Sequence, residues 1–499
     1  MINSLYSNMK RDGLEPNIFT FNILLKALCK NSRWDGACKL LEEMSKKKCE
    51  PDKVSYTTIV SSLCRLGRVI EANNLAMQFP PVVSVYNALI NGYCKVNQIE
   101  LAFQLLTQME DKGIVPNVIT FSCLINSLSQ GGNIRMILVI LGHMLRIGCF
   151  PNVHTFASLM KGYILVGEIH GALNIWNLML YQGIRPTVVA YNTLIHGFCL
   201  FGKIEEAVSL SYLMEERECH PNVVTYASII DGYSRAGDIA GASGTWNRMM
   251  SNGCSPNVVV CTCMVSALCR SSLLNQAHSF LEKMVSLKCP PTTITLNTFI
   301  KGLCMHGRVD WAIKIFNQMA GYGCLPSNTT YNELLHGVFE ANYVTDGFRL
   351  IRKMEEEKVF PTVVTYNIMI HGLSGVGMIR QALQCFAKMM VSGAMPDAIT
   401  YNSLINAYST QGKVETALVL ADRLSASGVW CPDVIACTSL ICGICRCLGF
   451  NEAVSYLEKI VSEGRCPNVV TWSVLVRSLF ENSGHMRSSC LLDGIIASV

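Results

Sequence analysis

Residues 361–397 read PTVVTYNIMIHGLSGVGMIRQALQCFAKMMVSGAMPD, and this segment contains the pattern that decides the fold. Apolar side chains recur at helical spacing in two stripes: Tyr366, Met369, Ile370 and Leu373, then Ala382, Leu383, Phe386 and Met389. Gly377 separates the stripes, and Gly393 and Pro396 follow the second one, where glycine and proline end a helix. The segment therefore predicts two amphipathic helices joined by a short turn.

Prolines repeat this pattern along the whole chain of 499 residues. Of the 16 prolines, 14 lie at residues 16, 51, 81, 116, 151, 186, 221, 256, 291, 326, 361, 396, 432 and 467, mostly 35 residues apart. With position 1 placed two residues after each proline, thirteen full repeats run from residue 18 to residue 468, and we number them 1 to 13. Residues 1–17 match the second helix of an earlier repeat, and residues 469–499 match an incomplete later repeat that acts as a cap.

The first residues of the chain lie inside a repeat. Leu5, Met9, Gly13 and Pro16 match positions 23, 27, 31 and 34 of the later repeats. These residues do not resemble an Arg- and Ser-rich transit peptide. We therefore expect either a truncated gene model or the removal of earlier repeats together with a transit peptide.

Four repeat positions have characteristic residue types that indicate how the predicted helices pack. Position 4 is usually aromatic, as in Tyr366, and position 15 is often glycine, as in Gly377. Position 20 is alanine in eleven of the thirteen repeats, and position 27 is methionine in ten. One helical hairpin cannot bury both of its stripes, so neighbouring hairpins must stack. The sequence thus predicts an all-α solenoid of about 13–14 helix-turn-helix repeats of 35 residues, wound as a right-handed superhelix.

Composition excludes several other classes of protein. Hydrophobic residues make up 50% of the chain, too many for a disordered protein, and no apolar run reaches the roughly 18 residues of a membrane span. The 41 basic and 36 acidic residues leave a net charge of +5, which permits a nucleic-acid partner without requiring one.

The spacing of the cysteines and histidines matches the repeat and does not match a metal-binding motif. Seven of the 24 cysteines occupy position 12 and six occupy position 32, where cysteine packs as a small buried hydrophobe. The densest group, Cys437, Cys442, Cys445 and Cys447, lies on one predicted helix without a histidine at zinc-module spacing. His196, His336 and His371 share position 9. We find no nucleophile–base pair or phosphate-binding loop, and expect a non-enzyme without metal or cofactor.

The period, with Pro361-Thr-Val-Val-Thr-Tyr-Asn-Ile-Met-Ile-His-Gly-Leu, closely resembles the pentatricopeptide repeat family, and the uniform 35-residue spacing resembles its P-type subclass. The tetratricopeptide repeat is the structural rival, but its period is 34 residues. The resemblance implies a plant organellar protein, mitochondrial or alternatively chloroplast, that binds single-stranded RNA of an organellar transcript. It implies one base per repeat, running 5′ to 3′ from the N-terminal end. We expect a monomer that has no membrane segment and can also contact protein partners.

In this family, positions 5 and 35 are held to choose the base, and they carry over to this chain as pairs. The uracil-type pairs are Asn22 with Asp52, Asn367 with Asp397, and Asn402 with Asp433. The pyrimidine-type pairs are Asn87 with Asn117, Asn192 with Asn222, Asn332 with Thr362 and, for cytosine, Asn297 with Ser327. Ser122 with Asn152 and Thr438 with Asn468 resemble adenine readers, and Thr262 with Thr292 a purine reader. Base choice stays open for Thr57 with Val82, Ala157 with Thr187, and Ala227 with Asn257.

Two further sets of positions follow from the resemblance. Position 2 supplies an apolar wedge against the base: Val54, Ile119, Val189, Val224, Val259, Val364 and Ile399, whereas Ser84, His154 and Thr329 break the rule. Basic residues at position 13 could contact phosphates: Lys30, Arg65, Lys95, Arg235, Arg270 and Arg446.

Each set also has a structural explanation. Asn or Asp directly after proline is a natural helix N-cap, which would account for every position-35 residue except Val82. A basic residue at position 13 is favourable near the C-terminus of a helix. At the level of the whole chain, a protein-binding scaffold is the alternative to an RNA-binding protein, as solenoids often bind proteins.

Overall fold

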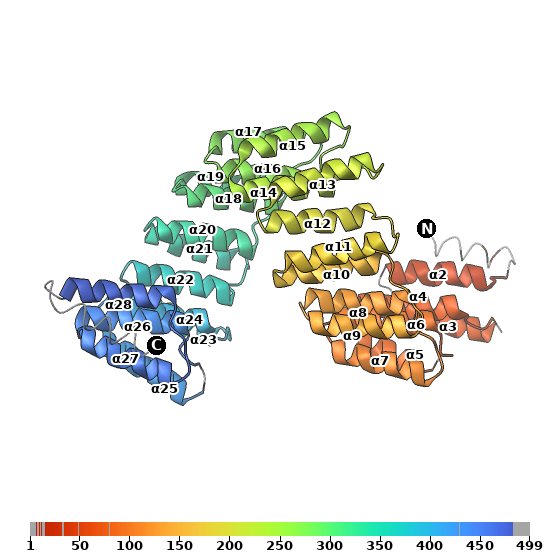
Figure 1. Ribbon diagram of the computed structural model, residues 1–499, viewed down its shortest axis with the longest axis horizontal. Coiled ribbons are helices and arrows are strands. Elements are labelled where there is room, and N and C mark those ends of the chain that lie inside the picture. Colours follow the sequence, from red (N-terminus) through yellow and green to blue (C-terminus); the bar gives the residue numbers. More distant parts are fainter. Residues whose placement is uncertain are drawn as a thin grey trace. The chain divides into compact units, whose positions relative to one another are not determined.

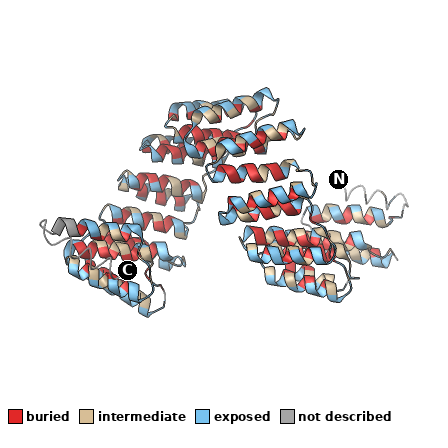
Figure 2. Ribbon diagram, in the orientation of Figure 1, coloured by how far each residue is buried: buried red, intermediate tan, exposed pale blue. Residues whose placement is uncertain are grey.

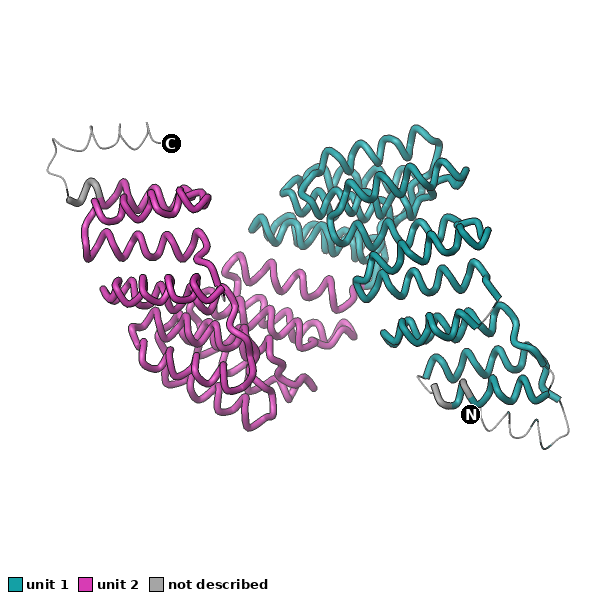
Figure 3. Tube along the Cα trace, turned by 90° about the horizontal axis from the view of Figure 1, so that it is seen from below, with its two compact units in different colours: residues 1–255 teal, residues 256–499 magenta. Residues whose placement is uncertain are grey.

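The computed structural model describes Tyr6, Met9, Arg11 and residues 15–31, 34–47, 49–78, 80–428 and 430–482. Within these ranges the chain is helical and contains no strand. Contacts divide it into two compact units, residues 1–255 and 256–499 (Figure 3). The predictions for Leu5 and Gly13, and for the part of the C-terminal cap beyond residue 482, lie outside the described residues.

In unit 1 each repeat contributes a first and a second helix (Figure 1). The first helices are α2 (Ile18–Lys30), α4 (Lys53–Arg65), α6 (Val83–Lys95), α8 (Val118–Gln130), α10 (Val153–Val166), α12 (Val188–Leu200) and α14 (Val223–Ala236). The second helices are α3 (Trp34–Lys46), α5 (Val69–Ala76), α7 (Ile99–Asp111), α9 (Ile134–Arg146), α11 (Ile169–Tyr181), α13 (Ile204–Glu216) and α15 (Ile239–Ser251).

Unit 2 repeats this order. Its first helices are α16 (Val258–Arg270), α18 (Thr293–Met305), α20 (Asn328–Glu340), α22 (Val363–Gly375), α24 (Ala398–Thr410), α26 (Val434–Cys447) and α28 (Val469–Asn482). Its second helices are α17 (Leu274–Ser286), α19 (Val309–Gln318) with the 3₁₀ turn η1 (Met319–Tyr322), α21 (Val344–Glu356), α23 (Ile379–Val391), α25 (Val414–Ala426) and α27 (Phe450–Ser462).

The core of each unit lies between its two layers of helices. Within each unit, consecutive first helices pack against one another, and the first helices α2 to α26 also pack against the second helix of their own repeat. The buried faces consequently point toward neighbouring helices (Figure 2). The predicted helical solenoid is therefore confirmed within each unit.

Positions 20 and 27 fill this core as predicted. The eleven alanines at position 20, such as Ala382, and the ten methionines at position 27, such as Met389, are completely buried. The second stripe of repeat 11 is wrong at one residue, because Leu383 is 37% exposed and Cys385 is buried instead. Leu383 lies one residue, about 100°, around the helix from Ala382, whereas Cys385 and Met389 follow it at helical spacing.

Two turns per repeat require a left-handed residue. Gly377 and Gly393 have φ of +84° and +78°, as expected for the glycines that follow the two helices of repeat 11. The same turns are left-handed where the sequence has no glycine, at Asn97, Ser272 and Asn342 after first helices and at Glu218, Lys288 and Lys358 after second helices. The fold thus imposes this conformation by position, even on residues that adopt it at a cost.

One repeat is shorter than the others for a local reason. Repeat 2 spans 30 residues, and its second helix α5 has 8 residues where most second helices have 13. The five missing residues are therefore removed from the second helix, and the first helix α4 keeps its full 13 residues.

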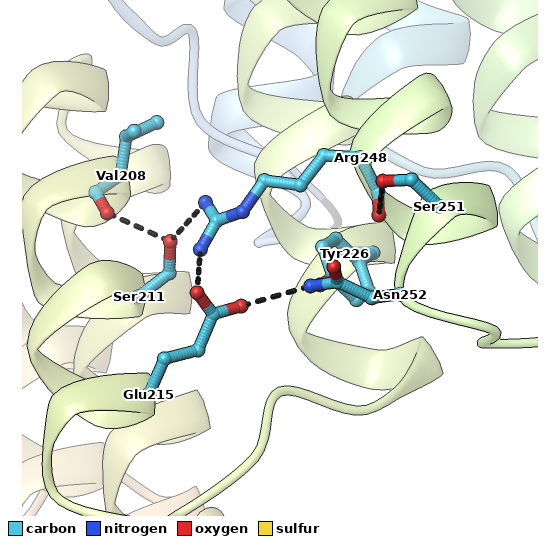
Figure 4. Close-up of polar contacts among 7 residues, drawn as sticks. All are labelled: Val208, Ser211, Glu215, Tyr226, Arg248, Ser251 and Asn252. Carbon is cyan, nitrogen blue, oxygen red and sulfur yellow. Dashed lines mark hydrogen bonds and ion pairs between the residues drawn. The ribbon is translucent and has the colours of Figure 1, made fainter.

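A polar cluster joins the second helices α13 and α15 (Figure 4). The Arg248 guanidinium donates to Ser211 Oγ at 3.0 Å and pairs with Glu215 at 2.9 Å. It also lies 3.7 Å from the centre of the Tyr212 ring, and Asn252 Nδ2 donates to Glu215 at 3.1 Å. Ser211 and Glu215 lie on α13 of repeat 6, and Arg248 lies on α15 of repeat 7. We therefore interpret the cluster as a contact that stabilises the packing of these two successive repeats.

Candidate nucleic-acid interface

The second residue of each first helix is exposed although it is usually apolar. All seven predicted wedge residues are exposed, from 49% at Val54 to 61% at Val259 and Ile399. Three other apolar residues at this position of the full repeats, Phe19, Ile294 and Ile435, are at least as exposed but were not predicted as wedges. Their repeat position alone would have identified them. A periodic row of exposed apolar side chains is typical of a binding surface.

In unit 2 two of the wedge residues line a cavity of about 590 Å³. Val364 and Ile399, from successive repeats, contribute apolar side chains to it, and the pair Asn367 and Asp397 contributes polar ones. His336 and His371, which share position 9 and were not among the predicted RNA contacts, also line it. Positions 2, 5, 9 and 35 therefore meet in one hollow.

Unit 1 contains a hollow built from the same repeat positions. It also measures about 590 Å³ and is lined by Ile119 and Val189, by the pair Ser122 and Asn152, and by Lys161 at position 9. The two units thus place equivalent side chains around equivalent cavities.

Positions 5 and 35 are in direct contact wherever asparagine is followed by Asp or Asn. In each case the position-5 amide nitrogen donates to a side-chain oxygen at position 35. The pairs are Asn22–Asp52 (3.1 Å), Asn87–Asn117 (3.1 Å), Asn192–Asn222 (3.2 Å), Asn367–Asp397 (2.9 Å) and Asn402–Asp433 (2.8 Å). Five of the predicted pairs are therefore brought together.

Pairs with a shorter side chain at position 35 are arranged differently. Asn297 Nδ2 donates to Thr329 Oγ1 at 3.0 Å rather than to Ser327. No hydrogen bond between Asn332 and Thr362 is present in the described residues. Ser and Thr have a hydroxyl one bond from Cβ, whereas the terminal oxygens of Asp and Asn lie further out.

Where position 5 is Ser or Thr, its hydroxyl meets a hydroxyl of the following repeat. Ser122 hydrogen-bonds with Thr155 (3.0 Å), Thr262 with Thr295 (2.8 Å), Thr438 with Thr471 (2.7 Å) and Thr57 with Ser84 (2.7 Å). The described residues show no direct bond from these hydroxyls to Asn152, Thr292 or Asn468. Ala157 and Ala227 are buried methyl groups and offer no polar atom.

The position-35 residues also cap helices, as their structural explanation requires. Asp397 Oδ1 accepts the Thr400 N–H at 3.0 Å, and similar bonds form at Asp52, Asn117, Asn152, Asn222, Asn257, Ser327, Thr362, Asp433 and Asn468. Thr187 is an exception, since its side chain makes no capping bond to the backbone. Capping and contact with position 5 therefore coexist in one side chain.

Hydrogen bonds lower the pKa of two of the capping carboxyl groups, Asp397 and Asp52. Partial burial opposes ionisation of Asp397, but bonds from the Thr400 N–H and the Asn367 amide outweigh it, so its pKa is lowered. The pKa of Asp52 is lowered in the same way, with burial outweighed by Ser55 and Asn22. Both carboxylates are thus ionised acceptors at neutral pH.

The predicted basic residues lie at the ends of the first helices. Lys30, Arg65, Lys95, Arg235, Arg270 and Arg446 are all exposed in the last turn. Arg235 forms an ion pair with Asp231 at 2.9 Å. This placement agrees with both explanations, a contact with phosphates and a favourable interaction of the positive charge with the C-terminus of the helix.

The position-12 cysteines behave as core residues. Burial raises the pKa of Cys199, Cys269 and Cys304 to about 12, so these thiols are protonated at neutral pH. The described residues contain no group of three metal-ligating side chains that could hold an ion. They also contain no helix long and apolar enough to cross a bilayer.

Comparisons with known proteins agree with this architecture. Models of the PPR repeat family match residues 1–30, 16–65, 81–130, 116–165, 151–199, 186–235, 221–270, 256–305, 291–339, 326–375, 361–410 and 432–481, and a PPR repeat model matches 399–429. A pentatricopeptide repeat-containing protein of Arabidopsis thaliana is 45% identical over 65 residues, 13% of this chain and 14% of that protein. Another, named chloroplastic, is 36% identical over 114 residues, 21% and 15% of the two chains.

Further relatives extend the comparison. An Arabidopsis thaliana protein of the same type, named mitochondrial, is 28% identical over 120 residues, 23% of this chain and 19% of that protein. The crystal structure of the pentatricopeptide repeat protein PPR10 from maize has a TM-score of 0.58 and 25% identity over 95% of this chain and 73% of that one. PPR10 in complex with an 18-nt psaJ RNA element has a TM-score of 0.50 and 21% identity over 98% and 88%. The repeat models cover most of the chain, which therefore belongs to the pentatricopeptide repeat family.

Proposed function

We propose that the chain is a sequence-specific binder of single-stranded RNA that docks one base per repeat, and is not an enzyme. The observation that carries the proposal is the contact between positions 5 and 35 beside an exposed apolar position 2, all around one hollow in unit 2. An amide can donate to and accept from a base edge, while an apolar side chain favours the flat face of a base. The RNA-bound structure of PPR10 supports this reading of the surface.

The proposed array is residues 18–468, with residues 1–17 and 469–499 as partial flanking repeats. In this proposal the chain is a P-type member that acts as a monomer on an organellar transcript, in its stabilisation, processing, splicing or translation. Relatives named chloroplastic and mitochondrial support an organelle as its location. The mitochondrion is our first choice and the chloroplast our second.

The proposed target, written 5′ to 3′, is U-?-Y-A-?-Y-?-R-C-Y-U-U-A, where Y is a pyrimidine and R a purine. A gel-shift competition between this RNA and a scrambled RNA of equal composition tests it. We expect the target to compete at lower concentration, and equal competition would refute the proposal. The double variant Asn402→Thr with Asp433→Asn should change the preference at the twelfth nucleotide from uracil to adenine.

A protein-binding scaffold is the second candidate, and a separate observation favours it. The residue just before the repeat proline is apolar and more than 70% exposed at Phe150, Leu325, Phe360 and Met395. Crosslinking separates the two functions. Recovery of RNA with the predicted pattern supports RNA binding, whereas recovery of proteins without RNA supports the scaffold.

A further inference from the structure

A buried hydroxyl at position 3 contacts the position-5 asparagine of the preceding repeat. It donates to the asparagine Oδ1 from Ser55 to Asn22 (2.5 Å), Thr120 to Asn87 (2.5 Å), Thr225 to Asn192 (2.6 Å), Thr365 to Asn332 (2.8 Å) and Thr400 to Asn367 (2.6 Å). All five donors are fully buried, so water does not compete for these bonds. The contact recurs in both units and does not depend on one local geometry.

The bonds around Thr400 show what the hydroxyl does. Its oxygen accepts the Asp397 N–H at 3.1 Å, so its single proton is free to be donated. Asn367 Oδ1 at 2.6 Å is a closer acceptor than Asp397 Oδ1 at 3.0 Å. The other amide atom, Asn367 Nδ2, donates to Asp397. Both ends of the Asn367 amide are therefore held, and one N–H and one lone pair are left for a base.

Repeat 12 has the same asparagine and aspartate without the hydroxyl. Asn402 Nδ2 donates to Asp433 at 2.8 Å, as in repeat 11. The third residue of the next first helix, however, is Ala436, and Asn402 Oδ1 is buried with no hydrogen-bond partner among the described residues. Only one end of this amide is held, which leaves its plane freer to rotate.

We propose that the position-3 hydroxyl is a positioning residue for base recognition in the preceding repeat, an inference that rests on the proposed RNA-binding function. The hydroxyl does not touch the base. It fixes the orientation in which the asparagine presents its donor and acceptor. Repeat 11, with Thr400, consequently discriminates between uracil and cytosine more strongly than repeat 12, with Ala436.

Reciprocal variants of the full chain test this. The ratio of dissociation constants for cytosine- and uracil-containing RNA is measured at the eleventh and twelfth nucleotides. Thr400→Val should lower the ratio at the eleventh nucleotide by about threefold and leave the twelfth unchanged, as one neutral hydrogen bond is removed. Thr400→Ser should restore the ratio, because Ser55 does the same work in repeat 2. Ala436→Thr should raise the ratio at the twelfth nucleotide.

Thr330→Val is the matched control for lost capping. Thr330 Oγ1 accepts the Ser327 N–H at 3.0 Å, as Thr400 does for Asp397, but Asn297 bonds to Thr329 instead. Thr330→Val should therefore lower the melting temperature about as much as Thr400→Val and leave the base ratio at the ninth nucleotide unchanged. A helix that is merely less stable would move both ratios equally, which would overturn the positioning role.

The remaining outcomes separate this inference from the proposed function. If the unmodified chain discriminates at the eleventh nucleotide and Thr400→Val retains the full ratio, the positioning role is overturned and the proposed function stands. If the unmodified chain prefers no base at any nucleotide, the proposed function is wrong and the inference is overturned with it.

Discussion

Repeats 11 and 9 both have asparagine at position 5, but its amide makes different hydrogen bonds in the two repeats. Asn367 is bonded at both ends, to Asp397 and Thr400. Asn297 turns to Thr329, and its Oδ1 is buried without a partner in the described residues. The identity of position 5 therefore does not determine its geometry, which depends on the cap that begins the next helix.

The largest expected effect comes from removing the asparagine that is fully held. Asn367→Ala should weaken binding of the proposed target by about tenfold, because a preorganised pair of hydrogen bonds is lost, at about 1.4 kcal/mol. Asn297→Ala should cost less, since its amide is not aligned by position 35. Gel-shift titration of both variants measures the difference, and equal losses would break the comparison.

Introducing a longer hydrogen-bond acceptor at position 35 of repeat 9 tests whether reach explains the difference between the two repeats. Ser327→Asp gives Asn297 a carboxylate oxygen at the reach that Asp397 has in repeat 11. We expect the preference at the ninth nucleotide to move from cytosine toward uracil by about fivefold, close to 1 kcal/mol. Competition with two RNAs that differ only at this nucleotide measures the change. Ser327→Ala serves as control, and a shift of the same size in it would show that reach is not the cause.

The repeat made most of the fold predictable. Two stripes, two turns and a 35-residue period were enough to locate the helices, and the register identified the buried alanine and methionine positions. Leu383 was placed wrongly because an apolar side chain near the edge of a stripe can be assigned to either side of it. The left-handed turns at Lys288 and Glu218 could have been predicted from register alone, although neither residue suggests one.

The candidate site was less predictable in one respect. The pairs of positions 5 and 35 were identified from family resemblance, but the resemblance does not say which pairs are in direct contact. Whether the two side chains touch depends on a difference of one bond in reach, as between Ser327 and Asp397. Whether the asparagine Oδ1 is also held depends on a third residue, Thr400 for repeat 11 and Ala436 for repeat 12, which the pair pattern does not include.

A substitution in the turn before repeat 9 tests whether this turn is the reason that Asn297 does not bond to position 35. Lys288 precedes that repeat with φ of +60°. Lys288→Gly should stabilise unit 2 by about 1 kcal/mol, because glycine adopts this conformation without the steric cost. Urea unfolding followed by circular dichroism measures the gain. The base preference at the ninth nucleotide should not move, and a change there would assign the difference between the repeats to the turn.

The smallest effect concerns pH, since repeat 11 has a carboxyl at position 35 and repeat 9 has a hydroxyl. The pKa of Asp397 is lowered in the folded chain, where hydrogen bonds from Thr400 and Asn367 outweigh the effect of burial. The folded carboxyl therefore binds a proton less tightly than the unfolded one. Its contribution to stability is complete above about pH 4, the ordinary pKa of an unfolded Asp, and is lost as the pH falls through the lower folded value.

Asp397→Asn isolates this contribution, because asparagine caps a helix and accepts from position 5, as Asn117 does, but does not titrate. The stability difference between the unmodified chain and Asp397→Asn, measured by urea unfolding, should be constant from pH 7 to pH 5 and shrink toward pH 3. Ser327→Ala in repeat 9 should show no such dependence. A difference that grows on acidification would mean that the carboxylate destabilises its repeat, and that the bonds to Asn367 and Thr400 do not favour the ionised form.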